Sequence, residues 1–257
     1  MTRNAARATG AYPAAMRLLL RLAAGLALIA VPARATAVPA SSGRLGHHLG
    51  RSSLGRPIDA LELRGRGARV VVLVIGCIHG DERMGERVVA ALARRPLQDG
   101  VDLWLVRSLN PDGEALHTRL NGRGVDLNRN FPAEWRLSGS PGDPEYSGPR
   151  PFSEPETRIA RALILRLHPD VTIWFHQPQA IIRAWGRSIP LARRYARLAG
   201  AVFRPLRWLR GTAPNWQNHR QRGTTSFVAE LPGGPLSGRD ARRYAIAVRR
   251  LARSIRR

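Results

Sequence analysis

Four short segments rich in β-branched and aromatic residues, separated by stretches with helical spacing, constrain the fold of this chain most. The first, residues 70–75, reads VVVLVI, an unbroken apolar run typical of strands buried on both faces of a sheet. The other predicted strands are residues 101–106, 171–175 and 224–229. Predicted helices occupy residues 84–95, 153–167 and 188–199, and a last one begins at Ser237 or Asp240. This alternation predicts an α/β fold, a single domain with a mixed, mostly parallel, twisted sheet and helices on both faces.

One of these helices has a local start signal. Ser153 and Glu156 match the S-x-x-E pattern of a capping box, and Pro155 stands where the first turn would be. The pattern predicts that the side chain of Ser153 caps the helix over residues 153–167.

The first 37 residues have the three-part pattern of a secretory signal. Arg17 and Arg21 precede an apolar run from Leu22 to Val31, and residues 35–37 form an A-x-A cleavage site. The apolar run is too short for a permanent membrane span. Because the pattern is complete from Met16, we expect the true start there and export to the periplasm or the cell exterior. An uncleaved anchor is the alternative interpretation.

The net charge of +24 comes from 42 basic residues, all of them arginine. They are spread along the chain, mostly singly or in pairs, so we expect no nucleic-acid partner. Seven of them lie between residue 240 and the end of the sequence: Arg242, Arg243, Arg249, Arg250, Arg253, Arg256 and Arg257. This segment is either a solvated helix face or a docking surface for an anionic wall polymer or a membrane surface. The single cysteine, Cys77, excludes an intrachain disulfide, and we expect it to be buried.

Residues suited to metal chemistry follow the predicted strands. His79 and Glu82 come after the first strand, His176 after the third, and Glu230 at the end of the fourth. In open α/β sheets, ligands bind beyond the carboxyl ends of the strands, so these side chains should converge on one edge. Two histidines and a glutamate are a ligand set of catalytic zinc, which leaves a fourth position for water. Glu230 suits the general base that takes a proton from that water.

Four separated segments resemble, in sequence order, the zinc carboxypeptidases. They are HGDE at residues 79–82, GVDLNRNF at 124–131, WFHQP at 174–178 and FVAELP at 227–232. The similarity is greatest to the bacterial branch of murein peptide amidases, which cut γ-D-glutamyl–diaminopimelate bonds in peptidoglycan peptides. The resemblance implies a zinc carboxypeptidase-like catalytic domain over residues 57–257. Residues 38–56 are polar, which predicts a flexible lead-in to this domain.

The resemblance also implies roles for individual residues. His79, Glu82 and His176 would bind one Zn²⁺, and Glu230 would act first as general base and then as general acid. Asp126 would fix the ring of the first histidine.

Three further positions would contact the substrate. Asn128 and Arg129 would hold a free carboxylate, which the planar guanidinium fork can bind through two parallel bonds. Arg119 would polarise the scissile carbonyl and stabilise the oxyanion, and Arg123, four residues later, is the alternative for this role.

The chain departs from the digestive carboxypeptidases in one respect. Those enzymes have a mobile tyrosine upstream of the base, whereas residues 205–220 contain no tyrosine and only two tryptophans, Trp208 and Trp216. The role is unnecessary, lost, or filled by Trp216, Asn215 or His219. The chain is also shorter than those enzymes, which predicts trimmed loops and an open groove.

Three functions remain in competition. The first is an exported zinc amidase or carboxypeptidase that acts on peptidoglycan peptides. The second is a zinc deacylase that acts on small N-acyl amino acids, and the third is a non-catalytic wall-binding relative. The first requires a complete metal site with its base and a place for a substrate carboxylate, so the arrangement of these side chains in space is decisive.

Overall fold

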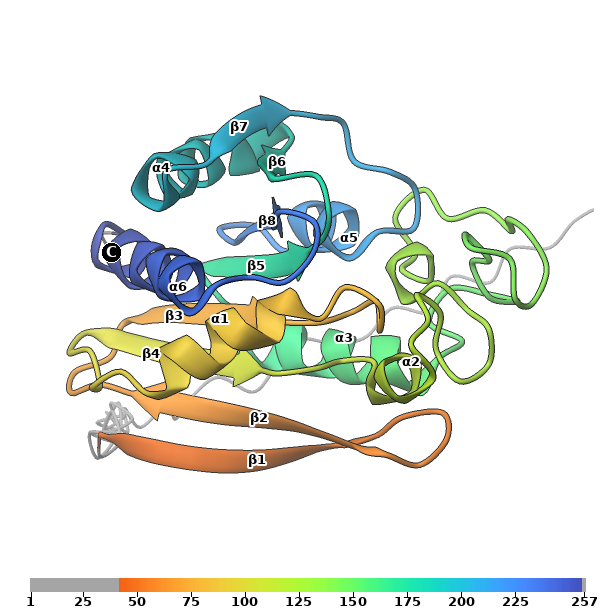
Figure 1. Ribbon diagram of the computed structural model, residues 1–257, viewed down its shortest axis with the longest axis horizontal. Coiled ribbons are helices and arrows are strands. Elements are labelled where there is room, and N and C mark those ends of the chain that lie inside the picture. The colour runs from red at the N-terminus through yellow and green to blue at the C-terminus, as the bar shows by residue number, and fades with distance from the viewer. Residues whose placement is uncertain (1–41, 256–257) are drawn as a thin grey trace, which may run out of the picture. The chain divides into compact units, whose positions relative to one another are not determined.

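The computed structural model describes residues 42–255, all of which lie in one structural unit, Val38–Arg257. The predicted signal segment lies outside the described residues. The described residues form one eight-stranded sheet with the order β1-β2-β4-β3-β5-β8-β6-β7 (Figure 1). The strands are β1 (Gly43–Arg51), β2 (Pro57–Arg64), β3 (Val70–Ile75), β4 (Val101–Val106), β5 (Val171–His176), β6 (Ile181–Ala184), β7 (Val202–Pro205) and β8 (Thr225–Glu230).

The sheet is mixed. Its central strands β4, β3, β5 and β8 are parallel, and β6 and β7 form a further parallel pair. The pairs β1–β2, β2–β4 and β6–β8 are antiparallel. The prediction of a mixed, mostly parallel sheet is therefore confirmed, and each of the four predicted strands has its counterpart within one residue at either end.

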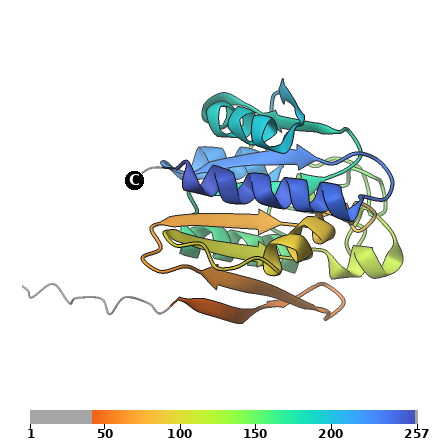
Figure 2. The same ribbon diagram turned by 60° about the vertical axis from the view of Figure 1, so that its left-hand side comes forward.

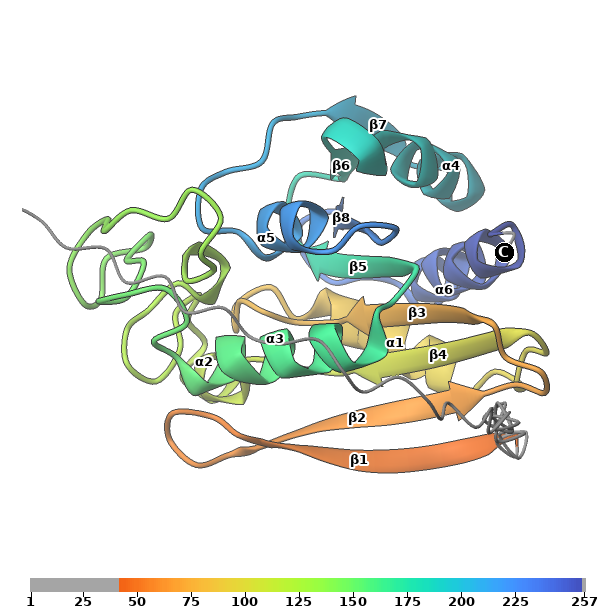
Figure 3. The same ribbon diagram turned by 180° about the vertical axis from the view of Figure 1, so that it is seen from behind.

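Helices cover both faces of this sheet, as predicted. They are α1 (Met84–Ala93), α2 (Pro111–Leu116), α3 (Pro155–Leu167), α4 (Ile189–Ala199), α5 (Ala213–Arg220) and α6 (Gly238–Arg253). On one face α6 lies between α1 and α4 (Figure 2). The opposite face carries α3 and α5 (Figure 3). Among residues 42–255, no helix combines the length and the apolar character that crossing a bilayer requires.

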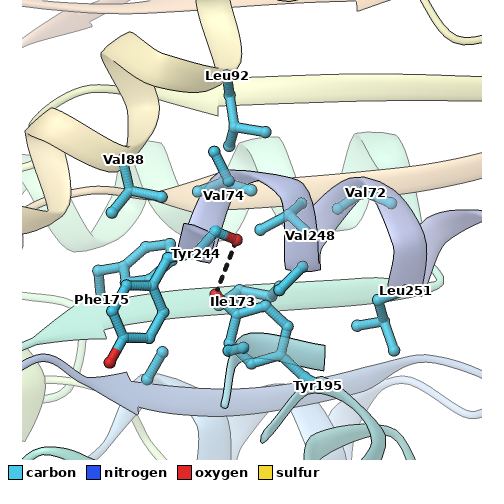
Figure 4. Close-up of a cluster of buried hydrophobic side chains, with 14 of the residues drawn as sticks. Val72, Val74, Val88, Leu92, Ile173, Phe175, Tyr195, Tyr244, Val248 and Leu251 are labelled. Atoms are coloured by element: carbon cyan, nitrogen blue, oxygen red, sulfur yellow. Dashed lines mark hydrogen bonds between the residues drawn. The ribbon is translucent and has the colours of Figure 1, made fainter. Parts of the chain in front are cut away.

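Alternation along the central strands explains the two layers. Val72 and Val74 of β3 point into the cluster formed with α1, α4 and α6 (Figure 4). Their neighbours Leu73 and Ile75 point to the other face, into the cluster that includes side chains of α3 and α5. An unbroken apolar strand is needed because both faces of the sheet are buried. Burial of each such side chain contributes about 1.5–3 kcal/mol to the free energy of folding.

The expected flexible lead-in is wrong over most of its length. Residues 43–51 form β1, which pairs antiparallel with β2 at the edge of the sheet. The ring of His47 stacks on Trp104 with centroids 4.4 Å apart, and its Nε2 lies 2.7 Å from Oε2 of Glu62. The sequence does not show this strand because an edge strand exposes one face to solvent and can be largely polar.

The predicted capping box is also wrong. Helix α3 begins at Pro155, and its N-cap residue, Glu154, makes no capping bond through its side chain. Ser153 Oγ instead donates to Glu154 Oε1 at 2.7 Å, while Glu156 accepts a bond from the backbone of Ser53 at 2.8 Å. Ser153 Oγ also accepts a bond from Nδ2 of Asn130 at 2.8 Å, so both side chains bond to distant segments, which a local pattern does not reveal. At α6, by contrast, Ser237 is the N-cap residue and accepts a bond from the backbone of Asp240.

Candidate metal centre

The carboxyl edge of the parallel strands brings the predicted metal ligands together. His176 is the last residue of β5 and Glu230 the last of β8, and the two are register partners. His79 and Glu82 lie in the turn that leads from β3 to α1. Gly80 lets this turn approach α2 closely, since a Cβ there would stand 1.9 Å from the carbonyl carbon of Gly113.

The carboxylate of Glu82 lies between two imidazole rings. Its Oε1 is 2.9 Å from Nδ1 of His79, and its Oε2 is 2.8 Å from Nδ1 of His176. Ligand atoms of these three residues lie within 4.8 Å of one another. Two imidazoles and one carboxylate at this spacing fit a zinc ion, which takes these donors in hydrolytic sites.

Charge pairing dominates this cluster. Burial alone would raise the pKa of Glu82, but His176 and His79 hold it well below its usual range. Burial lowers the pKa of His79, yet the carboxylates of Asp126 and Glu82 outweigh burial and raise it to about 9. The carboxylates of Glu82 and Asp126 therefore favour a positive charge next to them.

Asp126 connects the cluster to Arg119. Its Oδ1 lies 3.2 Å from Nε2 of His79, the ring nitrogen that faces away from Glu82. Its Oδ2 accepts bonds from Nε and Nη2 of Arg119 at 3.0 and 2.9 Å. Asp126 is fully buried, so it fixes the imidazole ring and the guanidinium in one arrangement.

The structure distinguishes the two arginines that the sequence left open. Nη1 of Arg119 lies 3.0 Å from Oε1 of Glu82 and 3.1 Å from Nδ1 of His79. The side chain of Arg123 is mostly exposed and lies 3.9 Å from Oε2 of Glu154, away from the cluster. Arg119 is therefore the arginine that lies at the predicted metal ligands.

Among the described residues, the side chain of Glu230 forms no hydrogen bond or ion pair with the predicted ligands, although Glu230 and His176 are register partners. Glu230 is 6% exposed, and its Oε2 is buried with no hydrogen-bond partner among the described residues. Burial raises the pKa of Glu230, while the neighbouring His176 opposes the rise. A buried carboxylate with a free oxygen and a raised pKa has the properties of a general base.

Asn128 and Arg129 line the same cleft, which has a volume of about 240 Å³. Oδ1 of Asn128 accepts a bond from the backbone of Ala213 at 3.0 Å, at the start of α5. The guanidinium of Arg129 contacts Glu145 at 2.7 Å, and the Glu145 side chain is mostly exposed. Arg129 also borders a larger groove of about 770 Å³ next to the cleft, so the site opens outward past this residue.

The candidates for the missing tyrosine lie in different places. Trp216 is buried against Phe131 in the core, and Asn215 and His219 line the outer groove. Trp208 borders both the cleft and the groove. Among these side chains, Trp208 is therefore the one placed at the cleft that contains Glu230.

Arg183 also lines the cleft, although its role there was not predicted from the sequence. It belongs to β6, a four-residue strand that was not predicted, and it lines the cleft together with Glu230 and Arg129. The available signal was an arginine within the apolar stretch Ile181–Ala184, shortly after the site histidine. Cys77 is fully buried, as predicted.

Two histidines and a glutamate at the carboxyl edge of a parallel sheet, with a buried carboxylate beside them, form the type of site found in zinc-dependent hydrolases. Residues 45–225 match the family model described as zinc carboxypeptidase. The chain belongs to this family. The match ends before Glu230, which the strand register places next to His176.

Murein peptide amidase A of Escherichia coli K12 is 36% identical over 147 residues, which make up 52% of this chain and 60% of that protein. The aligned part thus spans less than two thirds of the relative. The crystal structure of the murein-tripeptide amidase of E. coli O157 matches with a TM-score of 0.65 and 28% identity, over 83% of this chain and 94% of that chain. Carboxypeptidase A of Helicoverpa armigera shares the fold, with a TM-score of 0.70 at 18% identity over 82% of this chain and 69% of that one.

Proposed function

We propose that this protein is a zinc-dependent amidase that hydrolyses peptide bonds in peptidoglycan-derived peptides, with γ-D-glutamyl–diaminopimelate as its preferred bond. The observation that carries the proposal is a single cleft that contains all the groups such a reaction needs. It is lined by the candidate zinc ligands and by the buried carboxylate of Glu230. It is also lined by Arg119, which suits the scissile carbonyl, and by Arg129, which suits a substrate carboxylate. The similarity to murein peptide amidases supports this choice of substrate.

His79, Glu82 and His176 would hold the zinc ion. When bound, zinc supplies Lewis-acid activation of water and of the scissile carbonyl. Glu230 takes the proton from the attacking water and returns it to the leaving amine, so it ends the cycle ionised. Nη1 of Arg119 donates to the carbonyl oxygen as negative charge develops there, while Asp126 keeps the guanidinium in place.

The leaving group carries the carboxylate that the cleft must bind. The guanidinium of Arg129 lies 2.7 Å from the exposed Glu145 and 4.0 Å from Oδ2 of the buried Asp126. Because Glu145 is mostly exposed, a substrate carboxylate can compete with it for the guanidinium. Asn128 lies beside it, with its carbonyl oxygen already used by the backbone of Ala213 and its amide group left to donate.

Purified zinc-loaded protein incubated with L-Ala-γ-D-Glu-meso-diaminopimelate tests the proposal. We expect mass spectrometry to detect L-Ala-D-Glu and free diaminopimelate. Cleavage of N-acyl amino acids alone would indicate a deacylase instead. No turnover by protein that retains zinc would indicate a non-catalytic relative.

Export is part of the same proposal, because peptidoglycan lies outside the cytoplasm and residues 16–37 have the signal pattern. The measurement is the N-terminal sequence of the protein recovered from the producing cells. An N-terminus shortly after residue 37 in the periplasm or medium is expected, and an intact N-terminus confined to the cytosol would contradict export.

A further inference from the structure

Arg183 has an incomplete set of partners in the cleft. Its Nε is buried and has no hydrogen-bond partner among the described residues, and its Nη2 donates to the backbone oxygen of Arg207 at 3.3 Å. Within residues 42–255 it forms no ion pair with a carboxylate. A guanidinium that lines a cleft and lacks a full set of partners favours a ligand that accepts hydrogen bonds.

Arg183 and Arg129 line the same cleft, and their charges interact. Burial lowers the pKa of Arg183, the nearby Glu230 opposes this, and the positive charge of Arg129 lowers the pKa further. Arg119, in contrast, is neutralised by Asp126 and Glu82 on the side of the metal ligands. Among the described residues Arg183 forms no ion pair, and the nearest acidic partner of Arg129 is the mostly exposed Glu145, so the two arginines can receive a ligand that carries two negative groups.

We propose that Arg183 binds a second carboxylate of the substrate, at the far end of the leaving amino acid, while Arg129 binds the first. This inference rests on the proposed function. Diaminopimelate carries a carboxylate at both ends, whereas lysine has a similar chain and lacks the distal carboxylate. Arg183 would therefore determine the preference for diaminopimelate peptides over lysine peptides.

The guanidinium of Arg183 suits this role chemically. Its planar fork can hold a carboxylate through two parallel bonds, and the side chain lines the cleft. A partly buried bond between charged groups discriminates against a ligand that lacks the partner by about 10- to 100-fold. Such a bond requires only that the distal end of the substrate is anionic. The test therefore changes the distal carboxylate of the substrate and keeps the rest of the peptide the same.

The test compares three tripeptides that differ only in the leaving residue: diaminopimelate, diaminopimelate with its distal carboxylate amidated, and lysine. For the wild-type protein we expect kcat/KM to fall by about 10- to 100-fold when the carboxylate is amidated or absent. In Arg183→Gln, kcat/KM for the diaminopimelate peptide should fall by a similar factor, while the two other peptides change little. Arg222→Gln is the matched control, since Arg222 is exposed at the opposite end of β8.

Each outcome decides the inference. Equal kcat/KM of the wild-type protein for the free and amidated peptides overturns it without any variant, so a variant that fails to fold does not matter. An equal loss on all three peptides in Arg183→Gln shows a structural role and also overturns it. If the wild-type protein cleaves no wall peptide, the proposed function fails separately. In that case, isothermal titration calorimetry compares the affinities of the protein for free diaminopimelate and for lysine. Tighter binding of diaminopimelate supports a carboxylate subsite at Arg183, and equal affinities would refute it.

Discussion

Asp112 anchors the edge of the sheet to the segment that supports the metal centre. It is fully buried in the first turn of α2 and accepts four bonds from the turn between β1 and β2. Its Oδ1 accepts from Ser52 Oγ at 2.8 Å and from Arg56 Nη1 at 2.9 Å. Its Oδ2 accepts from Ser53 Oγ at 3.0 Å and from the backbone of Leu54 at 2.9 Å. One carboxylate therefore satisfies four donors.

Replacing Asp112 by Asn should destabilise the protein by about 2–4 kcal/mol. Each carboxylate oxygen of Asp112 accepts two bonds, so the amide nitrogen of an asparagine faces two donors whichever way its side chain is turned. The negative charge opposite Arg56 is also lost. Each lost bond to a charged acceptor costs about 1.5–3 kcal/mol, and rotation of a serine hydroxyl recovers part of the loss. Urea unfolding followed by tryptophan fluorescence at pH 7 measures the change in free energy.

Asp59→Asn is the matched control. Asp59 lies 2.8 Å from His48 across the exposed face of the β1–β2 pair, and its side chain is 60% exposed. The same change of charge there should alter the free energy of unfolding by less than about 0.5 kcal/mol.

The pH dependence provides a second check on Asp112. Burial alone would raise its pKa, but the bonds from Leu54, Ser52 and Arg56 lower it below the usual value. A carboxyl group whose pKa is depressed by folding contributes stability above its unfolded pKa of about 3.9 and loses this contribution as the pH falls. The difference between the wild-type protein and Asp112→Asn should stay constant from pH 7 to 5 and shrink below about pH 4. A difference below 0.5 kcal/mol at pH 7, or one that grows toward acid, would refute the reasoning.

Three predictions concern the site. Glu230→Gln should keep its zinc and lose at least about 100-fold in kcat, measured on the diaminopimelate tripeptide, and full activity would exclude it as the base. His176→Asn should retain little zinc by elemental analysis while circular dichroism shows an intact fold, and a full zinc content would exclude it as a ligand. Arg119→Gln should lower kcat by about 100-fold, whereas Arg123→Gln should leave it unchanged, and the reverse pattern would show that the wrong arginine was assigned.

The apolar pattern of the chain was sufficient to predict the central sheet. Residues 70–75 are buried on both faces as β3, and the other predicted strands differ from the structure by at most one residue at either end. Because parallel strands end at one edge, their order along the chain placed His79, His176 and Glu230 together before any distance was known.

Strand β1, by contrast, could not be predicted from its own residues. Most of its side chains are exposed or only partly buried, and its pairing depends on β2 and on Trp104, which lie outside the segment. The same reason explains the failed capping box, since Ser153 and Glu156 bond to groups from other parts of the fold.

The sequence by itself determined which residues can bind a metal and which segments must be buried, because both depend on residue type and on local periodicity. Only the tertiary structure decided which arginines lie at the candidate site. Arg119 and Arg123 are equivalent as sequence, and Arg183 lies in a short strand with no distinctive pattern. A guanidinium acquires a role from the carboxylates and the cleft around it, and those come from segments far away in the chain.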